Sequence, residues 1–347
     1  MDALVVSVRA RNPAFTDETL RSDLLFVASA PMTPADGLRR ALRHLWHPAT
    51  TEAALDVAAA LHRPLGARVI AEQVVVVRTD DGLAAFPDRC LHRSIALSAG
   101  SVDDNCLVCA GHGWRWAVDG RCVAIPDLPP RGIPARARLD VLDVAQAHGL
   151  VWVRLETAAD TRPPRLGDAH FDGPAIDVSA GAARIVDLLL DPERWLRMLG
   201  LAGETIGVVR VHESGPGVIT AQTTTGAWSI EVELHVPFAT RFEARRSGVA
   251  EAERSVVIAV APTDDHTSRV YWHVSDDAVL APAFASMLQA DGDLLMGADS
   301  SPSMLAPGHE LSVASDGMSV AYRRAMAGLV AAARQGPGPL AALVRTA

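Results

Sequence analysis

Two short clusters of metal-binding side chains constrain this chain more than any other feature of its sequence. They are Cys90-x-His92 and Cys109-x-x-His112, and the sixteen residues 93–108 separate them. Each cluster offers one soft thiolate and one imidazole. A [2Fe–2S] centre in which two cysteines hold one iron and two histidines hold the other needs this ligand set. The two-part motif therefore predicts a Rieske cluster bound by these four residues.

Two other uses of the same residues fit the sequence less well. A Cys2His2 zinc site usually has roughly two to four residues between its paired ligands, whereas a single leucine separates Cys90 from His92. Cys106 and Cys109 form a CxxC pair, but the sequence around them lacks the βαβ pattern of thioredoxin-like redox motifs. That pairing also leaves Cys90, His92 and His112 without a role.

The ligand set also indicates what such a cluster does. Imidazoles in place of two thiolates remove negative charge, which raises the reduction potential to a range of roughly −150 to +300 mV. A centre in that range accepts an electron from a flavin or ferredoxin donor and passes it on. Trp114 and Trp116 follow the second cluster closely, and we expect them to pack around it and limit water. The motif thus predicts an electron relay.

Length, charge and cysteine usage limit the classes of function. At 347 residues the chain fits two domains of ordinary size. Its net charge of −9 argues against a nucleic-acid partner. Charge interrupts the apolar stretches before the ~18 residues that a membrane helix needs, and the N-terminus lacks the basic region of a signal peptide. With Cys106 and Cys122 interpreted as ordinary small side chains, we expect a cytoplasmic protein that binds no membrane.

The order of apolar patterns predicts an α+β fold in three sections. Residues 1–40 form an N-terminal extension, whose end carries a capped helix with an apolar stripe. Residues 41–158 form a small antiparallel-β domain that contains both metal-binding clusters. Residues 159–347 form a second domain in which a sheet is followed by helices.

Within the second domain the pattern predicts a helix near the start, a run of strands, and two helices at the end. The first helix is expected to begin near Ile185, after an irregular connection over 157–180, and to run to Leu199. The strands and the later helices are expected at 206–212, 218–225, 227–236, 238–245, 254–262, 268–274, 282–299 and 316–335.

The sequence around both clusters resembles the Rieske domain of the ring-hydroxylating and O-demethylating Rieske non-haem iron oxygenases, the vanillate demethylase-like group. The resemblance implies an oxygenase alpha subunit whose Rieske domain precedes a helix-grip, START-like α+β catalytic domain. Leu91 stands where the family usually has Pro, and Ala110-Gly111 stand where it has Pro-Tyr; these positions supply no ligand, so we expect a shifted potential and a retained cluster. The segments that carry the likeness are 44–46, 88–100, 109–116, 120–122 and 149–153.

The resemblance also implies a mononuclear Fe(II) site, which two histidines and one carboxylate hold in the family. The family pattern is Asp-x-x-His-x4-His on the first helix of the second domain, with the carboxylate further along the chain. Here Asp191 matches the family's bridging aspartate and Asp291 fits the carboxylate ligand, but Arg194 and Leu199 stand where the histidines belong. Arginine has no lone pair to give and leucine has no donor atom. We therefore expect a degenerate site without mononuclear Fe(II).

Other histidines could replace the missing ligands only one at a time. His148, His212, His235, His266 and His273 each lack a spaced partner, which is more typical of structural or surface histidines than of metal ligands.

An all-carboxylate set of Asp191, Glu193 and Asp291 is the remaining alternative, but Arg194 would lie inside it. Without a metal, carboxylates that share a pocket repel each other. The planar fork of an arginine suits bidentate binding of carboxylates. We therefore expect Arg194 to pair with Asp191, Asp291 or both, with Leu199 as an apolar wall.

These features favour one functional hypothesis and leave two alternatives open. The first is an electron-transfer subunit, a pseudo-oxygenase partner of a competent homologue in a hetero-oligomeric monooxygenase or hydroxylase. The alternatives are a complete Rieske oxygenase that hydroxylates or demethylates a small organic substrate at a non-standard metal site, and a stand-alone redox carrier or sensor.

The resemblance also implies partners. They are a ferredoxin or flavin reductase that draws on NAD(P)H, and a homologous Rieske oxygenase subunit in a trimer or hexamer. In the family, the cluster of one chain faces the iron of the next across the aspartate that matches Asp191.

Overall fold

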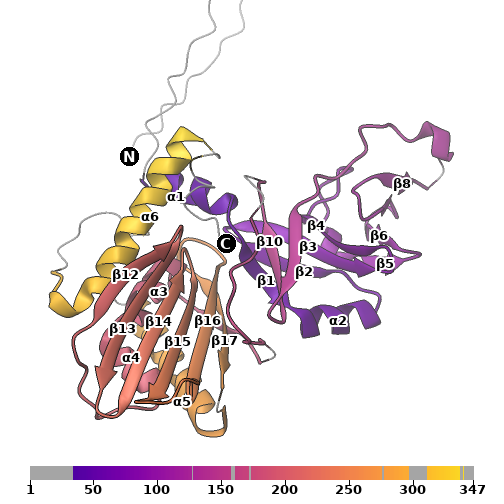
Figure 1. The fold of residues 1–347 in the computed structure, drawn as a ribbon. Helices are drawn as coiled ribbons and strands as arrows, with labels where there is room; N and C mark the ends of the chain where they lie inside the picture. Colours follow the sequence, from indigo (N-terminus) through magenta and orange to yellow (C-terminus); the bar gives the residue numbers. More distant parts are fainter. Residues whose placement is uncertain are drawn as a thin grey trace, which may run out of the picture. The chain divides into compact units, whose positions relative to one another are not determined.

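The computed structural model describes residues 34–126, 128–157, 161–171, 173–275, 277–296, 311–336 and 339. Contacts divide the chain into residues 1–33 and a compact unit from Pro34 to the C-terminus. The expected N-terminal extension thus lies outside the described residues up to position 33. Its described part belongs to helix α1 (Pro34–Arg43). Figure 1 shows the elements of the compact unit.

Short antiparallel strands build the first half of this unit. They form three small sheets with the strand orders β1-β10-β9, β2-β3-β4 and β5-β6-β7-β8. Four consecutive valines make the middle of β3 fully buried, and β3 pairs with β2 on one side and β4 on the other. The elements are β1 (His47–Thr51), α2 (Glu52–Ala60), β2 (Leu65–Val69), β3 (Glu72–Thr79), β4 (Gly82–Pro87), η2 (Leu97–Ala99), β5 (Ser101–Asp103), β6 (Cys106–Val108), β7 (Arg115–Trp116), β8 (Cys122–Ala124), η3 (Pro130–Gly132), β9 (Asp143–Ala147) and β10 (Leu150–Arg154).

One seven-stranded antiparallel sheet dominates the second half. Its strand order is β11-β17-β16-β15-β14-β13-β12, so consecutive strands from β12 to β17 are neighbours and β11 returns to pair with β17. The elements are β11 (Ile176–Val178), α3 (Ala182–Leu189), α4 (Pro192–Met198), β12 (Arg210–Gly215), β13 (Val218–Thr225), β14 (Trp228–His235), β15 (Ala239–Arg246), β16 (Arg254–Pro262), β17 (Ser268–Val274), α5 (Asp277–Met296), η4 (Ala314–Asp316) and α6 (Gly317–Gln335).

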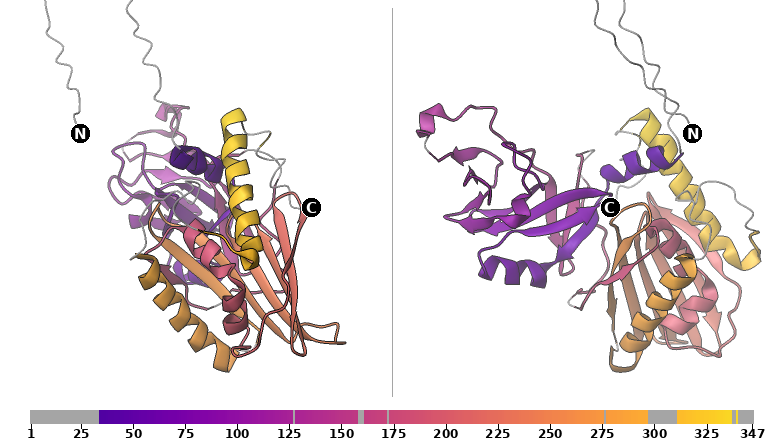
Figure 2. Two further views of the ribbon diagram at one scale, coloured as in Figure 1. Left: turned by 90° about the vertical axis from the view of Figure 1, so that its left-hand side faces the viewer. Right: turned by 180° about the vertical axis from the view of Figure 1, so that it is seen from behind.

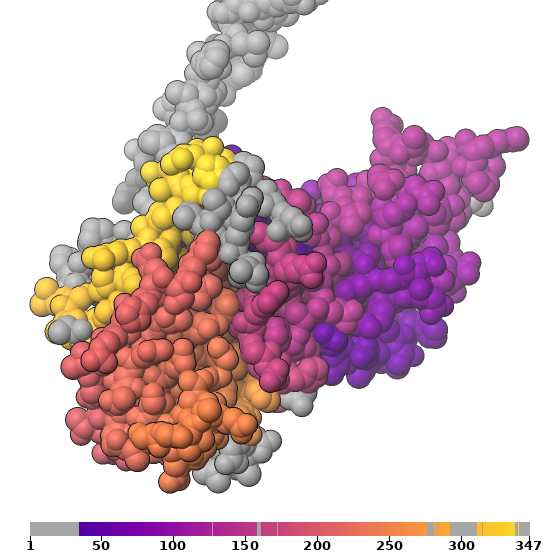
Figure 3. Space-filling model, in the orientation of Figure 1, coloured from indigo at the N-terminus to yellow at the C-terminus, as the bar shows by residue number. Residues whose placement is uncertain are grey.

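Helices cover one face of this sheet, as Figure 2 shows from behind. On β14 the buried side chains Ile230, Val232 and Leu234 alternate with polar residues such as Glu231 and Glu233. That period of two gives β14 one apolar face and one polar face, whereas β16 is buried on both faces along most of its length. Figure 3 shows strands of the large sheet at the molecular surface.

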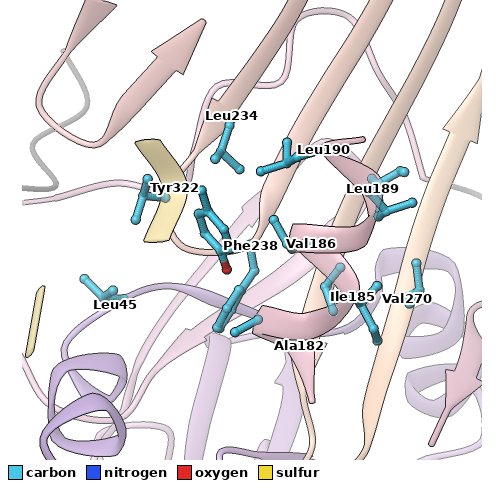
Figure 4. Packing of buried hydrophobic residues seen from close by; sticks show 14 of the residues in the cluster. Leu45, Ala182, Ile185, Val186, Leu189, Leu190, Leu234, Phe238, Val270 and Tyr322 are labelled. Atoms are coloured by element: carbon cyan, nitrogen blue, oxygen red, sulfur yellow. The ribbon is translucent and has the colours of Figure 1, made fainter. Parts of the chain in front are cut away.

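Helix α3 presents an apolar stripe to the core between the helices and the sheet. Ala182, Ile185, Val186 and Leu189 are all buried, and their spacing places them on one side of the helix. Figure 4 shows them packed among side chains that include Tyr322 of α6, which is fully buried. The helices are thereby fixed to the sheet by apolar contact.

The two halves share contacts and a common core. The Tyr271 hydroxyl donates a buried hydrogen bond of 3.0 Å to the Ala49 carbonyl. The backbone N–H of Ile70 donates to the Pro262 carbonyl at 2.7 Å. Buried apolar residues of the first half, including Val69, belong to the same hydrophobic cluster as those of the large sheet. These contacts explain why residues from 34 onward form one unit.

The predicted α+β class is confirmed. The strands expected at 218–225, 254–262 and 268–274 have the predicted bounds, and α6 begins one residue later than expected. Among the helices that the structure describes, none is long and apolar enough to cross a membrane.

Three expected boundaries in the second domain are wrong. The single helix expected from about Ile185 to Leu199 is two helices, because the Asp191 carboxylate caps α4 and Pro192 takes its first position, where no N–H is needed. Helix α5 begins at Asp277, five residues before the expected start, so Pro282 lies inside it.

The third correction concerns the strand expected at 206–212. The structure has β12 there instead, which begins at Arg210 and ends at Gly215. Two bonds join the residues ahead of it to β13: the Gly207 N–H donates to the Thr224 carbonyl at 3.0 Å, and the Thr225 hydroxyl donates to the Thr205 carbonyl at 2.7 Å. Strand β11 lies inside the segment expected to be an irregular connection, and its three residues are too few to show a period in the sequence.

Candidate functional site

Two loops of the same construction hold the four candidate cluster ligands. In the first loop the Cys90 N–H donates to the Ile95 carbonyl at 2.8 Å, and the Ser94 N–H donates back to the Cys90 carbonyl at 2.8 Å. In the second loop Cys109 makes the same pair of bonds, with the Trp114 carbonyl at 2.9 Å and the Gly113 N–H at 3.0 Å. Each turn therefore begins at a cysteine and closes on the residue four positions later.

Both turns need a left-handed backbone at their closing residue. The φ angle is +55° at Ser94 and +67° at Gly113. Glycine adopts this conformation freely, while serine does so at some cost. The two turns are built alike around their cysteines, although His92 follows Cys90 by two positions and His112 follows Cys109 by three.

The loops bring the four side chains together with the thiols inside and the imidazoles outside. Cys90 and Cys109 are each 2% exposed, and both are free thiols. His92 and His112 are exposed, yet their Nδ1 atoms lie 3.2 Å apart and their rings meet edge to face with 4.4 Å between centroids. Two nitrogen donors that converge in this way suit a single metal ion.

Electrostatics agree with a bound cation at this place. Burial, and the neighbouring Cys109 thiol, raise the pKa of Cys90 to about 11. Desolvation and the nearby His112 and Arg93 lower the pKa of His92. The His92 imidazole is therefore available as a neutral ligand, whereas the Cys90 thiol needs a positive ion to lose its proton. A ligand set of this kind fits a [2Fe–2S] group.

Two tryptophans wrap the candidate ligands, as expected. The Trp114 ring stacks on the His92 ring at a centroid distance of 4.9 Å and an angle of 7°. Trp116 is 1% exposed and lies 5.8 Å from Trp114 between ring centroids. The buried Trp116 Nε1 has no hydrogen-bond partner among the described residues. This unpaired N–H beside the two cysteines fits a bound group that supplies a hydrogen-bond acceptor.

Sequence reasoning missed two contacts that shape the loops. A Cβ atom added at Gly111 would lie 2.2 Å from the Ile95 Cδ1 atom, so the second loop has no room for a side chain where the family usually has tyrosine. The Asp88 carboxylate accepts from the Ser98 N–H at 2.7 Å and from its hydroxyl at 2.5 Å, which braces the first loop. Both contacts join residues about ten or more positions apart.

The second candidate site lies where α4 meets α5. The Arg194 Nη1 atom lies 2.5 Å from the Asp291 Oδ2 atom, and the two side chains are 14% and 9% exposed. Leu199, at the C-terminal end of α4, is completely buried in the hydrophobic core. The expected pairing of Arg194 with Asp291 is therefore present.

Asp191 does not take part in this ion pair. It is exposed, and its Oδ1 accepts from the Glu193 N–H at 3.0 Å as the cap of α4. Glu193 is exposed as well. We expected Arg194 to pair with Asp191, Asp291 or both, and it forms the ion pair with Asp291.

Two of the isolated histidines of the sequence, His148 and His235, have hydrogen-bond partners. His148 bonds through Nδ1 to the Ala169 carbonyl at 3.3 Å, and its Nε2 accepts from the Leu166 N–H at 3.1 Å. His235 pairs with Glu233 at 2.7 Å. In the described part of the chain, no group of three or more His, Cys, Asp or Glu side chains has the arrangement of a metal site. A Rieske cluster does not need one, because each iron takes two protein ligands and inorganic sulfide supplies the rest.

Comparison with known proteins agrees with this geometry. The family described as Rieske [2Fe-2S] domain matches residues 46–145, which include both ligand loops. The methylxanthine N1-demethylase NdmA of Pseudomonas putida is 29% identical over 326 residues, or 86% of this chain and 92% of the relative. A vanillate O-demethylase oxygenase subunit of a Pseudomonas species is 34% identical over 92 residues, 26% of this chain and 25% of the relative.

Solved structures show the same likeness over the whole chain. The structure of Pseudomonas putida NdmA with caffeine superposes with a TM-score of 0.76 and 26% identity, covering 89% of this chain and 97% of the other. The structure of NdmB from the same organism gives a TM-score of 0.73 and 25% identity, covering 88% and 96%.

Fold, ligand loops and comparisons together define the class of protein. This chain contains a Rieske [2Fe-2S] domain followed by an α+β catalytic-type domain. The chain as a whole is similar over 86% of its length to the methylxanthine N1-demethylase NdmA of Pseudomonas putida.

Proposed function

We propose that this chain is the electron-relay subunit of a Rieske-type hydroxylase or demethylase complex, and that its own mononuclear site is degenerate. The Arg194–Asp291 ion pair carries the proposal. The family resemblance assigns both positions to iron ligands. A guanidinium there repels a divalent cation and occupies the carboxylate that would hold it. Leu199, at the second histidine position, has no donor atom.

The Rieske domain would supply the remaining activity. We assign the cluster to Cys90, His92, Cys109 and His112, because they share two equivalent loops and converge in space. When bound, the cluster supplies one-electron transfer. The buried cysteines anchor it, while the exposed histidines leave one edge open to another protein.

This arrangement implies two kinds of partner. A ferredoxin or flavin reductase, reduced by NAD(P)H, would deliver electrons to the cluster. A homologous subunit with a complete iron site would accept them across the exposed histidine edge. A trimer or hexamer of such subunits would bring the cluster of this chain close to the mononuclear iron of its neighbour. Turnover at the neighbour then does not need a mononuclear iron in this chain.

A complete oxygenase is the second candidate, and the comparisons favour it over the relay alone. NdmA and NdmB are N-demethylases of methylxanthines, and the match to NdmA covers 92% of that protein. If this chain oxidises a substrate itself, a small N- or O-methylated heteroaromatic molecule is the class to expect. A stand-alone redox carrier has less support, because the second domain retains its full sheet and helices.

Turnover with and without a homologue separates the two candidates. The purified chain is given an NAD(P)H-dependent reductase and caffeine or vanillate, first alone and then co-expressed with a homologue that retains both iron-ligand histidines. We expect the chain alone to be reduced but to release no demethylated product. We expect the homologue to co-purify and to form product. Product from the chain alone would establish the second candidate instead.

A matched variant tests the relay within the complex. His112→Ala in this chain, with the homologue unchanged, should lower product formation in the mixed complex. An unchanged rate would show that this chain's cluster delivers no electrons to its neighbour.

A further inference from the structure

The Trp116 indole carries a buried N–H group that no described residue of the chain satisfies. The side chain is 1% exposed on β7, and its Nε1–H makes no hydrogen bond among the described residues. Buried polar groups are almost always paired, and an unpaired one costs about 1–3 kcal/mol. By contrast, the equally buried Trp152 donates its Nε1–H to the Ala147 carbonyl at 3.2 Å. The Trp116 donor is therefore available to a neighbouring group that becomes a stronger acceptor on binding a metal.

That group is the sulfur of Cys90. Trp116 belongs to the same buried cluster as Cys90 and Cys109, and its indole acts on the Cys90 thiol as a side-chain donor. A neutral thiol is a weak acceptor, which explains why no full hydrogen bond forms. A thiolate bound to iron carries negative charge and accepts much better.

We propose that Trp116 donates an N–H···S hydrogen bond to the Cys90 sulfur of the bound cluster and thereby raises the reduction potential of that cluster. The inference rests on the proposed assignment of Cys90 as a ligand. Trp116 is then a positioning residue, since it acts through Cys90 and does not bind iron.

The direction of the effect follows from charge. Reduction adds an electron to the cluster, and some of the added charge resides on its sulfur atoms. A fixed N–H dipole aimed at one of these sulfurs stabilises the reduced state more than the oxidised state. Hydrogen bonds to sulfur are one of the means by which proteins set these potentials. Trp114 differs, because it stacks its ring face on His92.

The test removes the N–H and keeps the ring. Trp116→Phe is compared with wild type and with Trp152→Phe, which loses a buried indole donor away from the cluster. A redox titration followed by EPR gives the midpoint potential, and pulsed EPR in H2O and D2O detects exchangeable protons coupled to the cluster. We expect Trp116→Phe to lower the potential and to lose one exchangeable coupling. Trp152→Phe should change neither.

The outcomes distinguish this inference from the ligand assignment. An unchanged potential and an unchanged proton coupling in Trp116→Phe, with the Rieske signal intact, would overturn the hydrogen bond alone. A wild-type protein without a Rieske signal would instead overturn the ligand assignment. If Trp116→Phe does not assemble its cluster, 3-benzothienylalanine at position 116 replaces N–H by sulfur in a ring of nearly the same shape. A lowered potential in that variant supports the inference, and an unchanged one contradicts it.

Discussion

The Nδ1 atoms of His92 and His112 lie 3.2 Å apart at the outer edge of the Rieske domain. If both bind one iron, replacing either leaves that iron with too few ligands. We expect His92→Ala and His112→Ala each to abolish the visible and EPR signature of the cluster. His212→Ala, an exposed histidine on β12, is the matched control and should keep it. A Rieske spectrum that survives both site variants would refute the assignment.

Gly111 in the second ligand loop lies against Ile95 in the first loop. Because an added Cβ would lie 2.2 Å from Ile95 Cδ1, Gly111→Ala should push the loops apart and reduce cluster occupancy, measured as iron and sulfide per chain. Ile95→Ala makes room, so the double variant should regain occupancy relative to Gly111→Ala. If the double variant is no better than the single one, the loops are not coupled at this contact.

The Arg194–Asp291 pair is mostly buried, and removing one member leaves the other without compensation. Arg194→Ala should lower the free energy of unfolding by about 3 kcal/mol, measured by urea denaturation. Arg197→Ala, on the exposed side of the same helix, should change it by no more than about 0.5 kcal/mol. Equal small effects of the two variants would mean that the pair is solvated.

At this scale the sequence predicted what depends on local spacing. Both cysteine–histidine pairs could be identified because each is contained in one turn. Which of the two carboxylates pairs with Arg194 could not be predicted. Asp191 accepts a hydrogen bond as the N-cap of α4, and Asp291 lies on another helix, far away in the sequence. The contact between Gly111 and Ile95 could not be predicted either, because no sequence pattern in one loop indicates which residue of the other loop it contacts.

Among the secondary-structure elements, the junction between α1 and β1 carries a titratable side chain. His47 begins β1, is 1% exposed, and bonds through Nε2 to the Leu42 carbonyl at 2.8 Å. A carbonyl only accepts, so Nε2 carries the proton. Desolvation lowers the pKa of His47 to about 4 from 6.5.

The sign of the resulting pH dependence follows directly. Neutral His47 stabilises the fold above pH 6.5, and this contribution is lost as the pH falls towards 4, because the unfolded chain binds the proton first. The shift corresponds to a loss on the order of 3 kcal/mol across that window. His47→Gln keeps an N–H donor but does not titrate. Its unfolding free energy should therefore fall less between pH 7 and pH 4 than that of wild type; parallel curves would rule out this role.

The elements also show where periodicity fails as a guide. The long strands of the large sheet were predicted to within a few residues, since their apolar patterns, alternating on β13 and continuous on β16, belong to strands of seven to nine residues. The break between α3 and α4 was missed, because an apolar stripe continues across Asp191-Pro192 although the helix does not. Capping chemistry decided that boundary.

For the molecule as a whole, the fold and the residues at the family's iron-ligand positions indicate different things. The second domain has a seven-stranded antiparallel sheet with helices, like NdmA, while an ion pair and a leucine occupy positions that the family resemblance assigns to iron ligands. The proposed relay explains both facts, because the fold is needed for assembly with a neighbour even where the local metal is not. The family resemblance could be recognised from the sequence. The particular homologous subunit that would pair with this chain could not, because no motif of this chain identifies it.

The number of iron atoms per chain tests this account most directly. Purified protein is measured for iron, sulfide and EPR signals, beside a variant with Arg194→His and Leu199→His that restores two histidines next to Asp291. The account predicts about two irons and a Rieske signal in the wild type, and about one further iron in the double variant after addition of Fe(II). A third iron already present in the wild type, removed by Asp291→Ala, would contradict it.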